Sequence, residues 1–172
     1  MLLFCFFGLF CAGMFFVLGY TRNRKQIVNE YFGICKLLTH MRGNLNTGAA
    51  PIAEALEGFE CSELENCGVL NVLKGGASDK SEEYVKFSGI LERKRLFGEI
   101  NFIIDKEDKD KFIEYLSSFG AFSLEEEILR LGVILEWFEN KYKNIKDRAD
   151  GEIKSAWVIF SGAFASALIL AL

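Results

Sequence analysis

The residue types that most often do acid–base chemistry are sparse in this sequence and form no catalytic pattern. The single histidine, His40, lies far along the chain from the three consecutive acids at 125–127. Those acids follow a serine at a predicted helix start, where negative charge complements the helix dipole. No phosphate-binding glycine loop, HExxH pair or GxSxG nucleophile turn occurs. We therefore expect a protein that is not an enzyme and needs no cofactor.

Two other readings stay open at this point. A membrane-anchored enzyme would draw its carboxylates and imidazole from Glu54, Glu57 and His40. A regulator that sequesters a soluble factor would need no catalytic group at all.

The cysteines do not predict a metal centre. Cys5 and Cys11 lie in an apolar run, and Cys35, Cys61 and Cys67 form no CxxC pair. A structural metal site usually needs cysteine or histidine ligands at close, paired spacing. We expect five free thiols in a reducing cytoplasm and no bound metal.

Charge limits the choice of partners. The net charge is −4, which offers no basic footprint for nucleic acid. The alternating run KEDKDK at 106–111 is expected to be a solvated helix face. Two segments are candidates for partner docking. The first is the basic cluster Arg93, Lys94 and Arg95, which could also bind an acidic lipid surface. The second is the predicted helix that starts at a proline, with Pro51 and Glu54.

All 20 basic and 24 acidic residues lie between Arg22 and Lys154. Outside that interval lie two uncharged runs, Leu2–Tyr20 and Ala156–Leu172. The length of each is close to the roughly 20 residues that a transmembrane helix needs. A cleaved signal peptide is the alternative for the first run, but its basic residues follow it instead of preceding it. A buried core helix is the alternative for the second. We expect transmembrane helices at 1–21 and 155–172.

Basic clusters set the predicted orientation. Arg22, Arg24 and Lys25 follow the first run, and five basic residues at 141–154 precede the second. Because basic residues accumulate on the cytoplasmic side, residues 22–154 are expected in the cytoplasm and both termini outside. Small residues four apart let membrane helices approach closely, and we name Gly8, Ala12, Gly162 and Ser166 as packing candidates, with each other or with a partner.

Helical spacing of apolar residues predicts an all-α fold, an antiparallel bundle flanked by the two membrane helices. The string NFII at 101–104 is assigned to a helix end or packed loop, since a lone strand has no partner. Ser123 and Glu126 form a predicted capping box, and Glu126 is also expected to pair with Arg130. The predicted helices run from the bilayer to about Arg42, over 51–57, 63–74, from 81 towards 97, from Asp105 to Gly120, and from Ser123 to Leu172.

Four strings resemble one protein family. They are Arg24-Lys25-Gln26-Ile27, Pro51-Ile52-x-Glu54-Ala55-Leu56, Phe119-Gly120 before Ser123, and Lys154-Ser155 with Gly162. With these strings the whole chain resembles stage III sporulation protein AB of endospore-forming Firmicutes.

The resemblance implies a component of the channel that links mother cell and forespore. The family's soluble domain is similar to the cytoplasmic domains of the platform protein of type II secretion machines. The partners implied are a cytoplasmic secretion-type ATPase, similar to stage III sporulation protein AA, and other channel membrane proteins. The implied location is the mother-cell membrane around the forespore.

Overall fold

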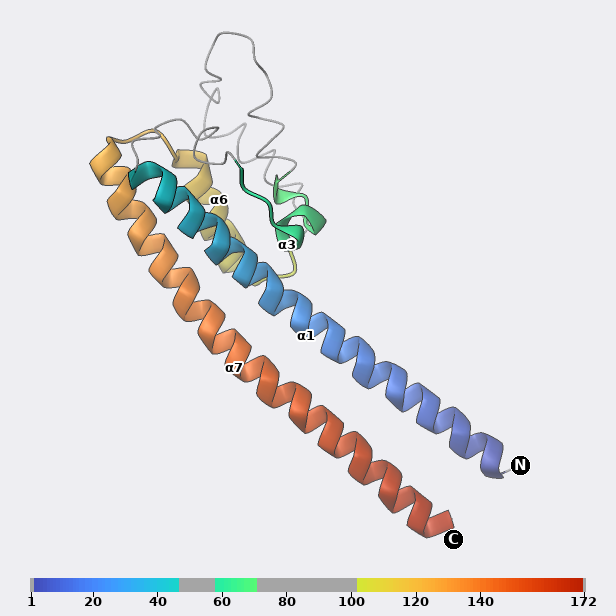
Figure 1. The fold of residues 1–172 in the computed structure, drawn as a ribbon. Coiled ribbons are helices and arrows are strands. Elements are labelled where there is room, and N and C mark those ends of the chain that lie inside the picture. Colours follow the sequence, from blue (N-terminus) through green and yellow to red (C-terminus); the bar gives the residue numbers. More distant parts are fainter. Residues whose placement is uncertain (1, 47–57, 71–101, 172) are drawn as a thin grey trace. The chain divides into compact units, whose positions relative to one another are not determined.

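A computed structural model of the chain describes residues 2–46, 58–70 and 102–171. Their regular structure is entirely α-helical, so the predicted all-α class is confirmed for this part of the chain (Figure 1). The predicted helix at 51–57 and the one from 81 towards 97 lie outside the described residues. The helices are α1 (Leu2–Asn46), α3 (Ser62–Asn66), α6 (Lys106–Ser118) and α7 (Leu124–Ala171).

Helix α1 ends four residues after the end that Gly43 predicts near Arg42. It continues through Gly43 to Asn46 because Leu45 is only 2% exposed and its burial offsets the roughly 1 kcal/mol cost of one helical glycine. Asn44 also contacts His40 one turn earlier, with Nδ2 and Nε2 3.1 Å apart. The prediction that the helix ends near Arg42 is therefore wrong by one turn.

Helix α7 begins where its capping residues predicted. The Ser123 amide donates to Glu126 Oε2 at 3.2 Å, and the Glu126 amide donates to Ser123 Oγ at 3.4 Å. These reciprocal bonds satisfy two amides that the first helical turn leaves unpaired. The helix then runs to Ala171 without a break at Gly151, which confirms the predicted near-continuous helix.

Two short segments differ from their predictions. The helix predicted over 63–74 is interrupted: α3 ends at Asn66, because Gly68 adopts a left-handed backbone with φ +79° that a helix does not contain, and residues 71–74 lie outside the described residues. Helix α6 follows Asp105 as expected, but the Asp105 side chain makes no capping hydrogen bond. The residues at 102–105 form the predicted packed loop, in which Ile104 is 6% exposed.

The chain divides into two compact units, and α1 and α7 contribute to both. The first unit comprises residues 1–28 and 143–172, and the second comprises 29–142. The predicted membrane boundaries near residues 21 and 155 fall inside continuous helices. Among the described residues, one helix, within Leu124–Ile169, is long and apolar enough to cross a membrane, and none of its apolar stretch is buried in the protein.

The second unit has the larger core. Phe138 of α7 lies at its centre, fully buried, with its ring centroid 6.3 Å from that of Tyr31 on α1 and 5.8 Å from that of Phe112 on α6. The Phe112 and Phe138 rings meet edge to face, an arrangement that adds to the burial energy. On α1 the core positions recur at alternating steps of three and four residues, and they are Tyr31, Ile34, Leu38, Met41 and Leu45.

Candidate interaction surfaces and buried polar clusters

The docking residues predicted from the sequence are not among the residues that the structure describes. Pro51, Glu54, Arg93, Lys94 and Arg95 all lie outside the described residues, as does Glu57 of the alternative catalytic set. His40 of that set is half-buried, and its ring centroid lies 5.2 Å from that of Phe59.

The predicted membrane-packing residues lie on exposed surface of the first unit. Gly8, Ala12, Gly162 and Ser166 are all exposed. A Cβ built on Gly8 or Gly162 would meet no atom within 4 Å. Gly8 and Gly162 thus leave open space around them, and the packing of all four residues, with each other or with a partner, stays a prediction.

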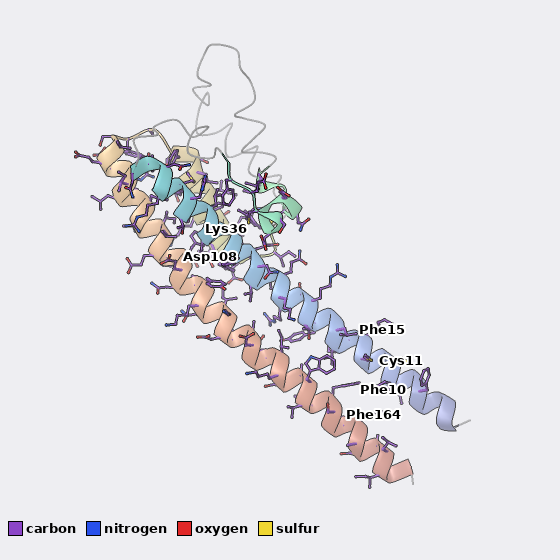
Figure 2. The ribbon with its side chains drawn as sticks, viewed as in Figure 1. Phe10, Cys11, Phe15, Lys36, Asp108 and Phe164 are labelled. Atoms are coloured by element: carbon purple, nitrogen blue, oxygen red, sulfur yellow. The ribbon has the colours of Figure 1, made fainter. Side chains whose placement is uncertain are left out.

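A different set of residues joins the two helix ends. The Phe10 ring lies 5.5 Å from the Phe160 ring and 4.5 Å from the Phe164 ring, measured between centroids (Figure 2). A Cβ on Gly13 would lie 2.6 Å from Cε2 of Phe160. The absent side chain of Gly13 thus makes the space that Phe160 fills. Sequence reasoning missed this glycine because it considered only small residues four apart.

A charged cluster also connects α1 and α7 in the first unit. The Tyr20 hydroxyl donates to Glu152 Oε2 at 2.9 Å, and Arg24 Nε lies 2.9 Å from the same oxygen. Arg148 Nε donates to Glu152 Oε1 at 2.8 Å. The hydrogen bond from Arg148, then that from Tyr20, lowers the pKa of Glu152, so the carboxylate stays charged.

Asp108 is fully buried, which contradicts the prediction that the run 106–111 is solvated. It accepts a hydrogen bond from the Tyr31 hydroxyl at 2.5 Å and one from Trp137 Nε1 at 3.3 Å. Lys141 Nζ lies 3.3 Å from its Oδ2. A buried carboxylate needs such partners because desolvation is otherwise costly. Asp108 therefore ties α6 to both α1 and α7.

Two ammonium groups lie near the ring of Trp137 on α7. Lys111 Nζ is 3.2 Å from the ring centroid, and Lys141 Nζ is 5.4 Å away. Cations over an indole face are attracted by its quadrupole. Lys111 is thus held against the protein surface, which is the second departure from a solvated charge run.

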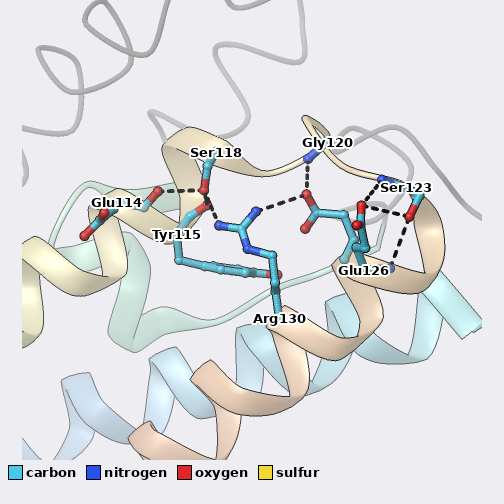
Figure 3. Close-up of polar contacts among 8 residues, drawn as sticks. Glu114, Tyr115, Ser118, Gly120, Ser123, Glu126 and Arg130 are labelled. Carbon is cyan, nitrogen blue, oxygen red and sulfur yellow. Dashed lines mark hydrogen bonds and ion pairs between the residues drawn. The ribbon is translucent and has the colours of Figure 1, made fainter.

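Glu127 and Arg130 join the α6–α7 turn to α7, and Figure 3 shows Arg130 bonded to Ser118. Glu127 is 3% exposed, and its Oε1 accepts the Gly120 amide at 2.9 Å. Arg130 Nη2 donates to Ser118 Oγ at 2.6 Å, and Nη1 lies 3.6 Å from Glu127 Oε1. Arg130 thus pairs with Glu127, and the predicted pair with Glu126 is wrong because Glu126 caps the helix.

A second buried acid fastens the 102–105 loop to α1. Glu30 is 3% exposed, and its Oε2 accepts the Ile103 amide at 2.8 Å. Burial raises the pKa of Glu30, and hydrogen bonds from the Ile103 and Ile104 amides partly oppose that rise. The sequence carries no local signal for this contact, since the partners lie 73 residues apart.

An open pocket of about 590 Å³ lies in the second unit beside Cys35. Its walls include Phe32, Phe59 and Tyr142, and Lys36 and Glu139 line it as well. Burial raises the pKa of the Cys35 thiol to about 11. A nucleophilic cysteine needs a depressed pKa, so this thiol is a packing residue.

A second groove, of about 440 Å³, runs along α7 in the same unit. We call it the α7 groove, and it is lined in part by Arg42, Leu129, Gly132, Val133, Glu136 and Glu139. Leu129 is 71% exposed and Val133 65%. None of the described residues that line this groove is a docking candidate named from the sequence.

Within the described residues, no group of three or more histidine, cysteine or acidic side chains is arranged to hold a metal ion. Comparison of the chain with protein-family models, with curated proteins and with solved structures finds no match.

Proposed function

We propose that this protein is a membrane platform component of a sporulation channel that couples a cytoplasmic secretion-type ATPase to the membrane. In this proposal both ends of the chain cross the bilayer and both termini lie outside. Residues 22–154 form a cytoplasmic antiparallel helical bundle. The family resemblance to stage III sporulation protein AB supplies the identity of the channel and of the ATPase.

The proposal that both ends cross the membrane rests on one observation: charged residues and exposed apolar residues occupy separate parts of the chain. No charged residue lies before Arg22 or after Lys154. In those ends the side chains of Phe15, Phe16 and Ile169 are each at least 74% exposed. Soluble proteins rarely leave so much apolar surface in contiguous contact with water, and lipid removes that cost.

The use of the buried acids supports a scaffolding role. Asp108, Glu127 and Glu30 each bind groups of another segment of the second unit. These carboxylates hold helices and loops together, and the exposed surface is left for partners. A scaffold that transmits position needs this kind of internal connection.

Co-purification tests the coupling. The full-length tagged chain is extracted from sporulating cells in a mild nonionic detergent, and the expected result is retention of the secretion-type ATPase. Loss of the ATPase from a chain that remains helical by circular dichroism would contradict the proposal. In the same cells, a variant with Glu54, Glu57 and His40 replaced is expected to retain both the ATPase and sporulation. Loss of sporulation with the ATPase still bound would favour the enzyme alternative.

Reporter fusions test the topology. Alkaline phosphatase fused after Leu172 is expected to be active, because it folds only outside the cytoplasm. A green fluorescent protein at the same position is expected to stay dark. Bright fluorescence at the carboxyl end would place that end in the cytoplasm and overturn the assigned topology.

A further inference from the structure

The α7 groove presents an apolar face within the charged, central part of the chain. Leu129 and Val133 lie one helical turn apart and are 71% and 65% exposed. Gly132 lies beside them, and a Cβ built on it would meet no atom within 4 Å. The groove is therefore open above Gly132, beside the exposed aliphatic side chains of Leu129 and Val133.

The spacing of these residues fits a helical occupant. Apolar side chains at i and i+4 form a ridge, and a partner helix packs its own apolar side chains beside that ridge. The glycine next to the ridge leaves room for a large side chain of the partner. Helix-in-groove recognition uses this combination of a hydrophobic trough and charged rims.

Acidic residues dominate the rim. Glu136 and Glu139 line the groove together with the single basic residue Arg42. Glu125 is exposed one turn before Leu129. In the part of the chain that the structure describes, no lysine or arginine forms an ion pair with any of these three carboxylates. Their charges are available to a partner.

The acidic rim favours some ligands of the α7 groove over others. An anionic lipid surface would be repelled by it. A second copy anchored in the same membrane would bring Glu136 against its own counterpart, because a parallel two-fold contact pairs identical residues. A basic partner gains attraction from the same charges.

We propose that the α7 groove binds a basic amphipathic helix of a partner protein. Apolar side chains of that helix lie against Leu129 and Val133, above Gly132. Its lysines or arginines, on the flanks, meet Glu136 and Glu139. The exclusion of a second copy rests on the membrane anchoring of the proposed function, whereas the groove and its charges are properties of the chain alone.

A designed peptide pair tests the proposal. The probe is an 18-residue helical peptide with leucines at i, i+3, i+4 and i+7 and lysines on both flanks, and its twin carries glutamates in place of the lysines. Binding to the full-length chain in a nonionic detergent is measured by fluorescence anisotropy, with empty micelles as the blank. The lysine peptide is expected to bind at least about tenfold more tightly than the twin, and less tightly in high salt.

Two groove variants and one matched control locate the binding. Glu136→Lys and Val133→Ser are each expected to weaken binding of the lysine peptide about tenfold. Glu107→Lys makes the same charge change on the exposed first turn of α6, and it is expected to leave binding unchanged. All three positions are exposed, so thermal melting of the variants is expected to match that of the parent chain.

Three outcomes would overturn the groove assignment: equal binding of both peptides, undiminished binding to both groove variants, or a dimer in light scattering that Val133→Ser converts to a monomer. The last would identify a second copy as the occupant. Co-purification of the ATPase tests the proposed function and not the groove. If the peptide fails while the ATPase is retained, the proposed function stands and the groove proposal does not.

Discussion

The hydroxyl of Tyr31 on α1 donates a 2.5 Å hydrogen bond to Oδ2 of Asp108, the fully buried acid in the first turn of α6. The partners lie 77 residues apart, so the bond closes a long loop. Together with the Trp137 indole and the Lys141 ammonium, this hydroxyl supplies the polar partners that a buried carboxylate needs. Desolvation, followed by the hydrogen bond to Asp108, raises the pKa of Tyr31, so the phenol remains a donor at neutral pH.

Replacement of Asp108 is expected to destabilise the second unit strongly. Asp108→Ala leaves the Tyr31 hydroxyl, the Trp137 indole N–H and the Lys141 ammonium without their acceptor, and removal of one partner of a buried charged pair costs about 3–5 kcal/mol. Tyr31→Phe removes a single bond to a charged group and is expected to cost about 1.5–3 kcal/mol.

Urea unfolding in detergent, followed by circular dichroism, measures both effects. The control is Asp110→Ala, since Asp110 is exposed on the same helix and surface substitutions usually stay within about 0.5 kcal/mol. Equal costs for Asp108→Ala and Asp110→Ala would contradict the role given to the buried cluster.

Gly13→Ala is expected to loosen the contact between the two helix ends. Its new methyl group would lie 2.6 Å from Cε2 of Phe160, and overpacking of this kind costs about 1–3 kcal/mol. Gly8→Ala is the matched control, since a Cβ there meets nothing within 4 Å. Thermal melting in detergent should fall for the first variant only.

A compensating change makes the Gly13 prediction specific. Phe160→Leu shortens the side chain that the methyl group meets, so the Gly13→Ala, Phe160→Leu double variant is expected to melt above Gly13→Ala alone. Additive losses in the double variant would show that Gly13 and Phe160 do not share a packing site.

Glu30 is expected to make stability depend on pH. Its pKa is raised by burial, so the folded state holds the proton more tightly than the unfolded state does. The contribution of Glu30 is therefore fully present below its ordinary pKa and is lost as pH rises through the folded-state pKa. Glu30→Gln keeps an acceptor for the Ile103 amide and carries no charge at any pH.

The measurement compares the free energies of unfolding of the parent chain and Glu30→Gln from pH 4 to pH 8. The stability of the parent chain relative to the variant should decrease across this interval. The comparison removes the shared titration of all other groups, and a difference that does not change with pH would refute the assignment.

Local signals predicted the long helices, and distant contacts escaped prediction. The capping box at Ser123 and Glu126 involves residues three apart, so the sequence alone located the start of α7. The burial of Asp108 depends on Tyr31 and Trp137, 77 and 29 residues away, and nothing in the run 106–111 distinguishes this acid from its neighbours. Sequence spacing likewise cannot tell which small residue of a long apolar helix faces its partner helix, as Gly13 and Gly8 illustrate.

Glu126 and Glu127, adjacent at the start of α7, have different roles: Glu126 caps the helix, and Glu127 is buried and binds the α6–α7 turn. Glu127→Ala is expected to cost about 1–3 kcal/mol, because the Gly120 amide and the Arg130 guanidinium lose the buried carboxylate that accepts from them. Glu126→Ala removes only the reciprocal half of the capping box at an exposed position, and it is expected to cost about 0.5–1 kcal/mol. Urea unfolding of the two variants in parallel measures the difference. If Glu126→Ala proved the more damaging, the exposed cap and not the buried cluster would hold the α6–α7 turn.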